Sequence, residues 1–235
     1  MKILAIETAT EGCSAALYLD GEVRERFAVA PREHSRLILE MMQALLAEAG
    51  LQVTALDALA FGRGPGSFTG VRIAAAVVQG TAYAAELPVA PVSTLVALAQ
   101  GCGHETGMHR VLAAIDARMQ EVYWAPCEAD EHGLMAPVGK EEVTPAARVQ
   151  LPDGEGWGAA GSGWGAYGEV LTSRLGDRLT AAPEPDRLPH ARDVAVLGAA
   201  MAAIGDLAPP ERAVPVYLRD HVARKMTPLD TPLSC

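Results

Sequence analysis

The order of strands and helices is the feature that most constrains the fold of this chain. Three apolar or alternating runs follow one another at the start with short turns between them, and Asp20-Gly21 is a hairpin signal. Strands are expected at residues 3–6, 14–19, 22–29, 57–62, 89–92, 111–116 and 121–124. Helices are expected at residues 36–49, 71–86, 94–100 and 193–204. Each half opens with paired strands and then alternates helix and strand, which predicts an α/β fold whose two halves share a plan.

The apolar residues indicate close packing of helices on sheets. Half of the 235 residues are hydrophobic but only 5% are aromatic, so Ala, Leu and Val must fill the core. Residues 101–109 contain three Gly and two His, and they are expected to form a linker between the halves.

The charge balance disfavours a protein that binds nucleic acid tightly on its own. There are 19 Lys and Arg against 29 Asp and Glu, a net charge of −10, whereas binding a phosphate backbone requires clustered cations. The densest basic group is Arg219, Arg224 and Lys225, which can touch tRNA only as part of a larger assembly.

The remaining composition favours the cytoplasm. The four cysteines are isolated from one another, the chain opens directly on a strand-like run, and no apolar stretch approaches 18 residues. We therefore expect no membrane span.

Gly62-Arg-Gly-Pro-Gly-Ser-Phe-Thr-Gly70 is the most unusual segment, because it joins a predicted strand to the N-terminus of a predicted helix. Backbone N–H groups at a helix N-terminus favour an anion, so Gly64, Gly66, Ser67 and Thr69 are candidates to contact a phosphate or nucleotide. The segment lacks the Lys-Ser/Thr ending of a Walker A loop and the spacing of a nucleophile elbow. The alternative is structural: the glycines permit a tight turn and close packing, with Thr69 as the helix cap.

Glu7 is a second candidate anion-site residue. It lies in the first turn, where a carboxylate can hold a metal-bound phosphate, although a lone turn acid is more often solvated. The six histidines show no metal-ligand spacing, and no Ser, Cys or Asp nucleophile has an identifiable base. No catalytic residue and no metal ligand are assigned.

The helices at 36–49 and 71–86 are apolar around more of their circumference than one sheet requires. An arc of about 100° is enough to cover a sheet. The candidate partner-contact residues on the two helices are Leu37, Ile38, Met41, Met42, Leu45, Ala74, Ala75, Val78 and Ala82. The alternative is that both helices are enclosed within this chain.

Several segments together resemble the TsaB (YeaZ) family, over nearly the whole chain to about Lys225. They are residues 3–10 (ILAIETAT), 31–35 (PREHS), 62–73 (GRGPGSFTGVRI), 91–95 (PVSTL), 115–119 (IDARM) with 121–123 (EVY), and 215–219 (PVYLR). The resemblance implies the actin-like ATPase (ASKHA) fold, with a complete lobe I at 1–103 and a reduced lobe II, with a Pro-rich tail, at 104–235.

The resemblance also implies a role. Family members are non-catalytic partners of the transferase TsaD, which modifies the tRNA adenosine next to the anticodon, and both work with the ATPase TsaE. TsaD is expected to bind on the two apolar helices, and the same surface is expected to form a homodimer when the chain is alone. The resemblance implies only indirect contact with tRNA and no tightly bound cofactor, with ATP, ADP or Mg²⁺ confined to a subunit boundary.

Two departures from the catalytic relative support this assignment. Thr94 and Leu98 stand where TsaD has a His-x-x-x-His metal motif, and neither side chain suits a transition metal. Asp116-Ala-Arg118 stands where ATP-using members of the fold have an Asp-x-Gly turn that binds phosphate. Glu7 stands where Asp is more usual. The rival hypothesis is an enzyme in its own right, either a peptidase or an ATP-dependent kinase of the same fold.

Overall fold

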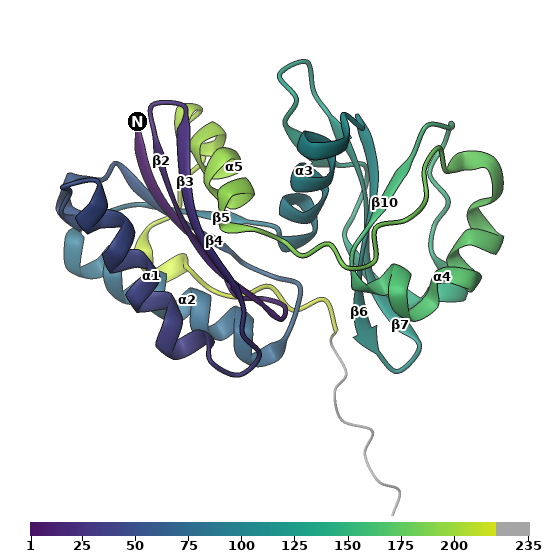
Figure 1. Cartoon of the computed structure of the whole chain (residues 1–235), viewed down its shortest axis with the longest axis horizontal. Helices are drawn as coiled ribbons and strands as arrows, with labels where there is room; N and C mark the ends of the chain where they lie inside the picture. Colours follow the sequence, from purple (N-terminus) through teal and green to yellow (C-terminus); the bar gives the residue numbers. More distant parts are fainter. Residues whose placement is uncertain (220–235) are drawn as a thin grey trace, which may run out of the picture.

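The apolar runs of the N-terminal part form a five-stranded sheet in the computed structural model, which describes residues 1–219 (Figure 1). Its strands are β1 (Lys2–Glu7), β2 (Gly12–Leu19), β3 (Glu22–Val29), β4 (Ala58–Gly62) and β5 (Val89–Val92), in the order β3-β2-β1-β4-β5. The first three strands are antiparallel, whereas β4 and β5 run parallel to β1. In β1, Ile3 and Ala5 belong to one core cluster and Leu4 and Ile6 to another, so both faces of the sheet are buried.

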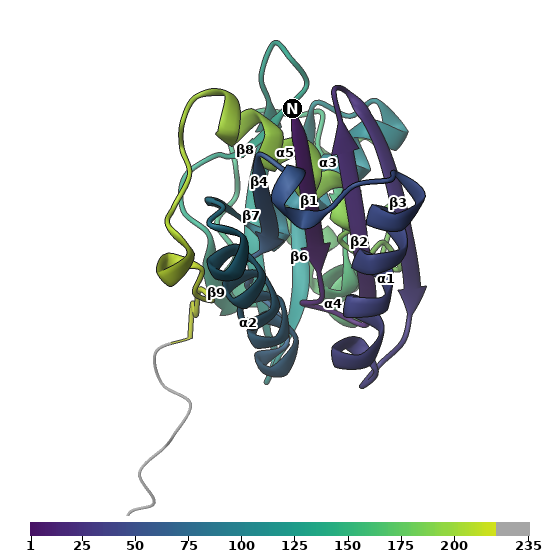
Figure 2. The ribbon, with the colours of Figure 1, turned by 90° about the vertical axis from the view of Figure 1, so that its left-hand side faces the viewer.

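Helices cover both faces of this sheet. α1 (His34–Glu48) and α2 (Phe68–Ala85) lie side by side on the outer face, as Figure 2 shows, and α5 (Ala191–Ala203) packs on the inner face. α5 approaches closely because Gly198 lacks a side chain: a Cβ there would lie 2.7 Å from the Ala60 Cβ. Within residues 1–219, no helix is long and apolar enough to cross a membrane.

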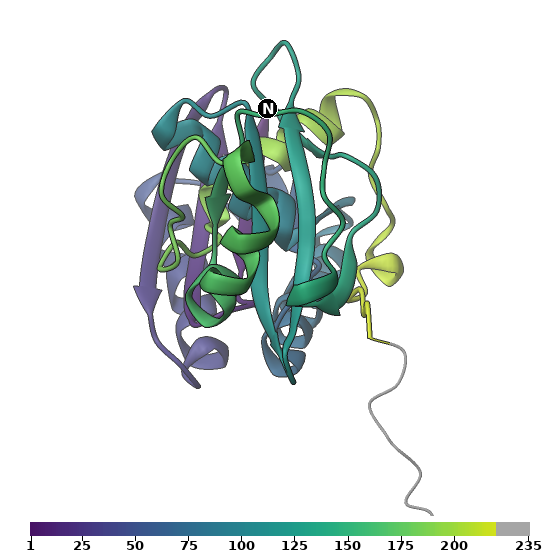
Figure 3. The same cartoon turned by 90° about the vertical axis from the view of Figure 1, so that its right-hand side faces the viewer.

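The second sheet is smaller and follows the same plan. It has the order β10-β6-β7-β8, and β9 also pairs with β7. Its strands are β6 (Arg110–Arg118), β7 (Glu121–Ala129), β8 (Met135–Pro137), β9 (Glu142–Pro145) and β10 (Gly158–Ala160). α3 (Thr94–Thr106) packs on its inner face, and α4 (Ser162–Leu175) covers the outer face (Figure 3). Short 3₁₀ turns occupy Val53–Ala55, Ala146–Arg148, Gly176–Arg178 and Pro210–Arg212.

The mixed α/β class is therefore as predicted, and the two-sheet plan is consistent with an actin-like fold. The proposed lobe boundaries need correction. α5 packs on the first sheet although it lies within 104–235, and α3 packs on the second sheet although most of it lies within 1–103. Since α3 and α5 also pack on each other, one core cluster runs through both sheets.

The expected linker at 101–109 is also wrong in its first part, because α3 continues to Thr106. The glycines there serve close packing. A Cβ on Gly101 would lie 2.6 Å from an Asp193 carboxylate oxygen of α5, and one on Gly103 would lie 2.8 Å from the Met108 carbonyl oxygen.

The predicted partner residues on α1 and α2 require the largest correction. Seven of the nine lie in the core of this chain: Ile38, Met42, Leu45, Ala74, Ala75, Val78 and Ala82. Leu37 and Met41 are half-buried against the same cluster. These residues are buried because the sheet is wide. Five strands at about 4.8 Å spacing span roughly 20 Å, and two helices of about 10 Å diameter must cover that width together. A broad apolar arc was needed inside the chain, so the seven core residues do not mark an external surface.

Candidate functional site

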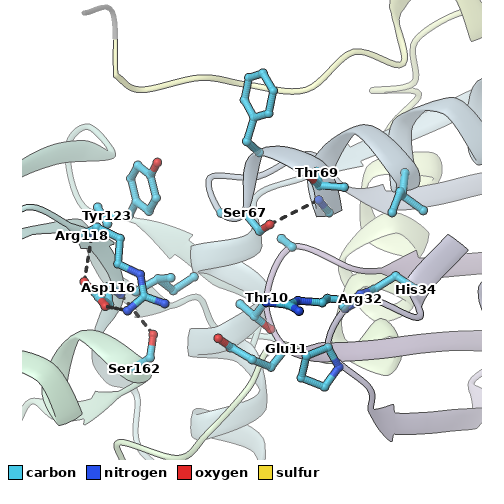
Figure 4. Close-up of a pocket in the computed structure, with 18 of the residues that line it drawn as sticks. Thr10, Glu11, Arg32, His34, Ser67, Thr69, Asp116, Arg118, Tyr123 and Ser162 are labelled. Atoms are coloured by element: carbon cyan, nitrogen blue, oxygen red, sulfur yellow. Dashed lines mark hydrogen bonds and ion pairs between the residues drawn. The ribbon is translucent and has the colours of Figure 1, made fainter. Parts of the chain in front are cut away.

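A cavity of about 690 Å³ opens where the ends of β1, β4 and β6 meet. The first sheet side contributes Thr10, Glu11, Arg32, Ser67 and Thr69, and the second contributes Asp116, Arg118, Tyr123 and Ser162. Figure 4 shows these two groups of side chains facing each other across the gap. Polar groups of both signs therefore converge on one space between the two halves.

The Gly-rich segment forms the turn between β4 and α2. Ser67 is the N-cap of α2, because its Oγ accepts the Gly70 N–H at 3.4 Å, so the predicted cap at Thr69 is wrong. The Ser67 N–H donates to the Ala9 carbonyl at 2.7 Å. A Cβ on Gly66 would lie 2.5 Å from that same carbonyl oxygen, and one on Gly70 would overlap the Thr8 carbonyl. The glycines thus let the turn pack directly on the β1–β2 connection, as the structural alternative predicted.

The structure divides the five predicted anion-site residues. Gly66, Ser67 and Thr69 line the cavity, whereas Gly64 and Glu7 are buried away from it. Gly64 has a φ of +98°, a left-handed conformation that favours glycine. The turn therefore brings only part of the predicted set to the cavity.

Glu7 is fully buried rather than solvated in a turn. Its Oε1 accepts the Ala9 N–H at 2.6 Å and its Oε2 accepts the Thr94 hydroxyl at 3.0 Å. Burial raises the pKa of this carboxyl from 4.5 to about 7, against the lowering effect of the two hydrogen bonds. A side chain already bonded on both oxygens and hidden behind Gly62 and Thr94 cannot reach a phosphate in the cavity, so the proposed contact at Glu7 is wrong for this structure.

The β6–β7 hairpin presents Asp116 and Arg118 to the cavity as an ion pair. Asp116 accepts bonds from the Arg118 N–H and guanidinium, each at 2.8 Å, and from the Tyr167 hydroxyl at 3.2 Å. Arg118, Met119 and Gln120 all have positive φ between 56° and 65°, a backbone conformation that non-glycine residues rarely adopt. The Asp116 carboxylate is therefore paired with a guanidinium of its own hairpin.

Thr94 and Leu98 fill the place where the resemblance puts metal ligands. Both are buried; Thr94 donates to Glu7, and a Cβ on Gly161 would lie 2.6 Å from a Leu98 methyl carbon. Among residues 1–219, no group of three or more His, Cys, Asp or Glu side chains is arranged to hold a metal ion. The donors present here do not suit a metal.

Sequence reasoning missed Arg32 and Ser162 as cavity residues. Arg32 lies inside the family segment 31–35, so the sequence did contain a signal that could have pointed to it. No sequence signal pointed to Ser162, because it follows a Gly-rich stretch. Only the folded β10–α4 turn places its Oγ 3.1 Å from the Asp116 backbone nitrogen, whose N–H it accepts. Arg224, Lys225 and the part of the Pro-rich tail after residue 219 lie outside the described residues.

Comparison with known proteins identifies relatives along the whole chain. A family model described as TsaD, tRNA N6-adenosine threonylcarbamoyltransferase, matches residues 28–224. The tRNA threonylcarbamoyladenosine biosynthesis protein TsaB of Escherichia coli (strain K12) is 46% identical over 237 residues, covering 97% of this chain and 99% of the relative. The protein of the same name from Haemophilus influenzae is 50% identical over 125 residues, 53% of each chain.

Two solved structures from Pseudomonas aeruginosa have the same fold. One, described as an uncharacterized protein with similarity to peptidase YEAZ, has a TM-score of 0.85 and 45% identity, and the match covers 93% of this chain and 99% of that one. The other, YeaZ, has a TM-score of 0.84 and 45% identity over 92% and 99% of the two chains. The chain therefore belongs to the TsaB (YeaZ) family of tRNA threonylcarbamoyladenosine biosynthesis proteins.

Proposed function

We propose that this chain is a non-catalytic scaffold subunit in the synthesis of threonylcarbamoyladenosine on tRNA, at the adenosine next to the anticodon. In this role it forms a heterodimer with the transferase TsaD and a complex with the ATPase TsaE, and it pairs with itself when alone. TsaD holds the tRNA, and the assembly works in the cytoplasm. The free, buried thiols of Cys13, Cys102 and Cys127 suit a reducing compartment.

The observation that carries the proposal is the packing around Thr94 and Leu98. A catalytic transition metal needs imidazole, thiolate or carboxylate ligands. Here a threonine hydroxyl bonded to Glu7 and a leucine packed under Gly161 occupy that place. The neighbouring carboxyl of Glu7 already has a hydrogen-bond donor on each oxygen.

The cavity supports the same conclusion about nucleotides. A phosphate at the α2 N-terminus would meet the Ser67 and Thr69 hydroxyls, but it would also face the carboxylates of Glu11 and Asp116. Of the two arginines that line the cavity, Arg118 is already paired with Asp116 at 2.8 Å, so within residues 1–219 only Arg32 offers a cation without an ion pair. We therefore expect ATP, ADP and Mg²⁺ to lodge only at the boundary with a partner, where that partner adds cations.

The partner surface is formed by the solvent-facing sides of α1 and α2 and not by the seven core residues of these helices. We call it the α1–α2 outer surface and define it by Leu39, Gln43, Ala76, Gly80 and Tyr83, which are all exposed. Leu39 is 47% exposed and Tyr83 is 76% exposed. A Cβ on Gly80 would meet nothing within 4 Å, so another helix can approach α2 closely there. Small residues flanked by exposed Leu and Tyr fit a helix-to-helix interface.

Ala76→Glu tests this surface without entering the core. We expect the variant to fold as the parent does, because Ala76 is exposed, and to lose co-purification with TsaD, because it places an unpaired carboxylate in a closely packed contact. Truncating or charging the centre of an interface typically costs about 2 kcal/mol or more, roughly a 30-fold loss of affinity.

Ala166→Glu is the matched control, since Ala166 is an exposed alanine on α4 of the second sheet. It should co-purify with TsaD like the parent. Undiminished association of the Ala76→Glu variant would contradict the proposed surface. Charged substitutions at Met42 or Leu45 are unsuitable, because both side chains are core residues and the chain would unfold.

A further inference from the structure

Two segments that the scaffold role leaves unexplained meet at the N-terminal end of α2. Phe68 and Arg72 come from the 62–73 segment, and Tyr217 comes from the 215–219 segment, 145 residues from Arg72. Arg72 Nε donates to the Tyr217 hydroxyl at 2.8 Å, and the guanidinium carbon lies 3.3 Å from the Phe68 ring centre. The Phe68 and Tyr217 ring centres are 6.0 Å apart. The result is an arginine held between two aromatic rings.

These side chains form one wall of a second pocket of about 370 Å³, between α2, β7 and residues 216–219, which adjoins the first cavity at Gly66, Phe68 and Tyr123. Tyr123 adds a third aromatic ring and Arg219 a second guanidinium. Arg219 donates to the Ala117 carbonyl at 3.0 Å and pairs with Glu121, whereas Arg72 forms no ion pair within residues 1–219. The described lining contains two arginines and no acidic residue, in a chain whose net charge is −10.

The aromatic rings of this pocket remain open to a ligand. Phe68 is 61% exposed and Tyr217 is 46% exposed. Pinning residues 216–219 to α2 accounts for the bond between Arg72 and Tyr217. It does not account for the exposure of Phe68, because the Arg72 guanidinium lies against one face of the ring and the residue is still 61% exposed, although burying it would be favourable.

We propose that this pocket binds one unpaired nucleotide of single-stranded RNA, with the base stacked on the exposed rings of Phe68 and Tyr217 and a phosphate at Arg72. Stacking of a base on an aromatic side chain is worth about 1–3 kcal/mol and is available to every base. The fork of an arginine matches phosphate oxygens. The inference goes beyond the scaffold role: it adds a weak contact to RNA that the partner mainly holds.

The test measures fluorescence anisotropy of end-labelled single-stranded RNA octamers with the full chain at low salt. Phe68→Leu should weaken binding at least about 5-fold, because 1 kcal/mol of lost stacking corresponds to that factor. Arg72→Gln should reduce the slope of log K against log salt by about 0.7, the value expected for one lost phosphate contact on a single strand. Ile204→Ala is the control: it trims an exposed apolar side chain outside the pocket and outside the α1–α2 outer surface, and it should leave binding unchanged.

Several outcomes would overturn the inference, provided that circular dichroism shows the variants to be folded. They are absence of octamer binding, equal effects of Phe68→Leu and Ile204→Ala, tighter binding of a duplex than of the single strand, or tighter binding of free AMP than of the octamer. Loss of TsaD co-purification by Phe68→Leu with RNA binding intact would make the pocket a protein contact instead. Ala76→Glu should bind RNA normally, so failure of either proposal can be told from failure of the other.

Discussion

At the scale of single residues, burial and hydrogen bonding compete at the Glu7 carboxyl. The donors Ala9 N–H and Thr94 hydroxyl favour the charged form, but complete burial outweighs them and raises the pKa to about 7. Glu7 also connects the end of β1 to the start of α3. The residue therefore joins the two halves of the chain. The free-energy cost of burying its carboxyl group depends on pH, because the charged form is the costly one.

Glu7→Gln should remove this pH dependence. A carboxyl whose pKa rises from 4.5 to about 7 on folding gives stability that is fully present below pH 4.5 and lost as pH rises through 7. The parent should lose on the order of 1–3 kcal/mol of unfolding free energy from this group between pH 4.5 and 8. The glutamine side chain stays neutral, so the variant should not lose this free energy. Its stability relative to the parent should therefore increase as pH rises. Urea unfolding of both proteins at pH 5 and pH 8 measures the difference; equal pH dependence would contradict the account.

At the scale of elements, the glycines of α2 serve two different purposes. Gly70, in the first turn, lies against the Thr8 carbonyl, and the Thr8 hydroxyl donates to the Gly70 carbonyl at 2.8 Å. Gly80, near the other end, is exposed and touches nothing that an added methyl group would displace. The first glycine permits packing within the chain, and the second leaves room outside it.

Alanine at these two positions should therefore change stability in opposite directions. Gly70→Ala forces a methyl group onto a backbone oxygen and should cost about 1–3 kcal/mol or more. Gly80→Ala adds a good helix former in open space and should stabilise the chain by up to about 1 kcal/mol. Thermal unfolding of the dilute chain compares them, and a shift in the same direction for both would show that the packing at Gly70 is wrong.

The sequence predicts the elements with a local apolar period, but it does not predict those in which glycines serve packing between distant parts of the chain. The strands at 3–6 and 14–19 and the helix at 36–49 were predictable, since their apolar periodicity is local. α4 was missed because four glycines between 161 and 168 read as a loop; the helix forms because Trp164, Leu171 and Leu175 bury on the second sheet. Gly101 read as a linker residue for the same reason, whereas its contact with Asp193 is a tertiary feature that no local pattern contains. At the site, Ser67 and Thr69 were predictable from the motif, but the burial of Glu7 was not.

At the scale of the whole molecule, the two sheets share one middle layer made of α3 and α5. Glu105 of α3 accepts from Arg187 at 2.9 Å and also pairs with Arg192 of α5, and Arg187 lowers the pKa of Glu105 to about 2. Arg63, beside the Gly-rich turn, pairs with Glu141 of the second half at 3.2 Å. The shared helical layer and these ion pairs therefore connect the two halves of the chain.

We propose that the chain supports catalysis by contact with its partner and not by chemistry of its own. Reconstituted transfer of threonylcarbamoyl to tRNA, with TsaD and TsaE, tests it through Asp116→Asn in the cavity and Ala76→Glu on the α1–α2 outer surface. If the chain is a scaffold, transfer stays near the parent level for Asp116→Asn, whereas Ala76→Glu loses both transfer and TsaD association. Loss of transfer by Asp116→Asn with TsaD association intact would contradict it.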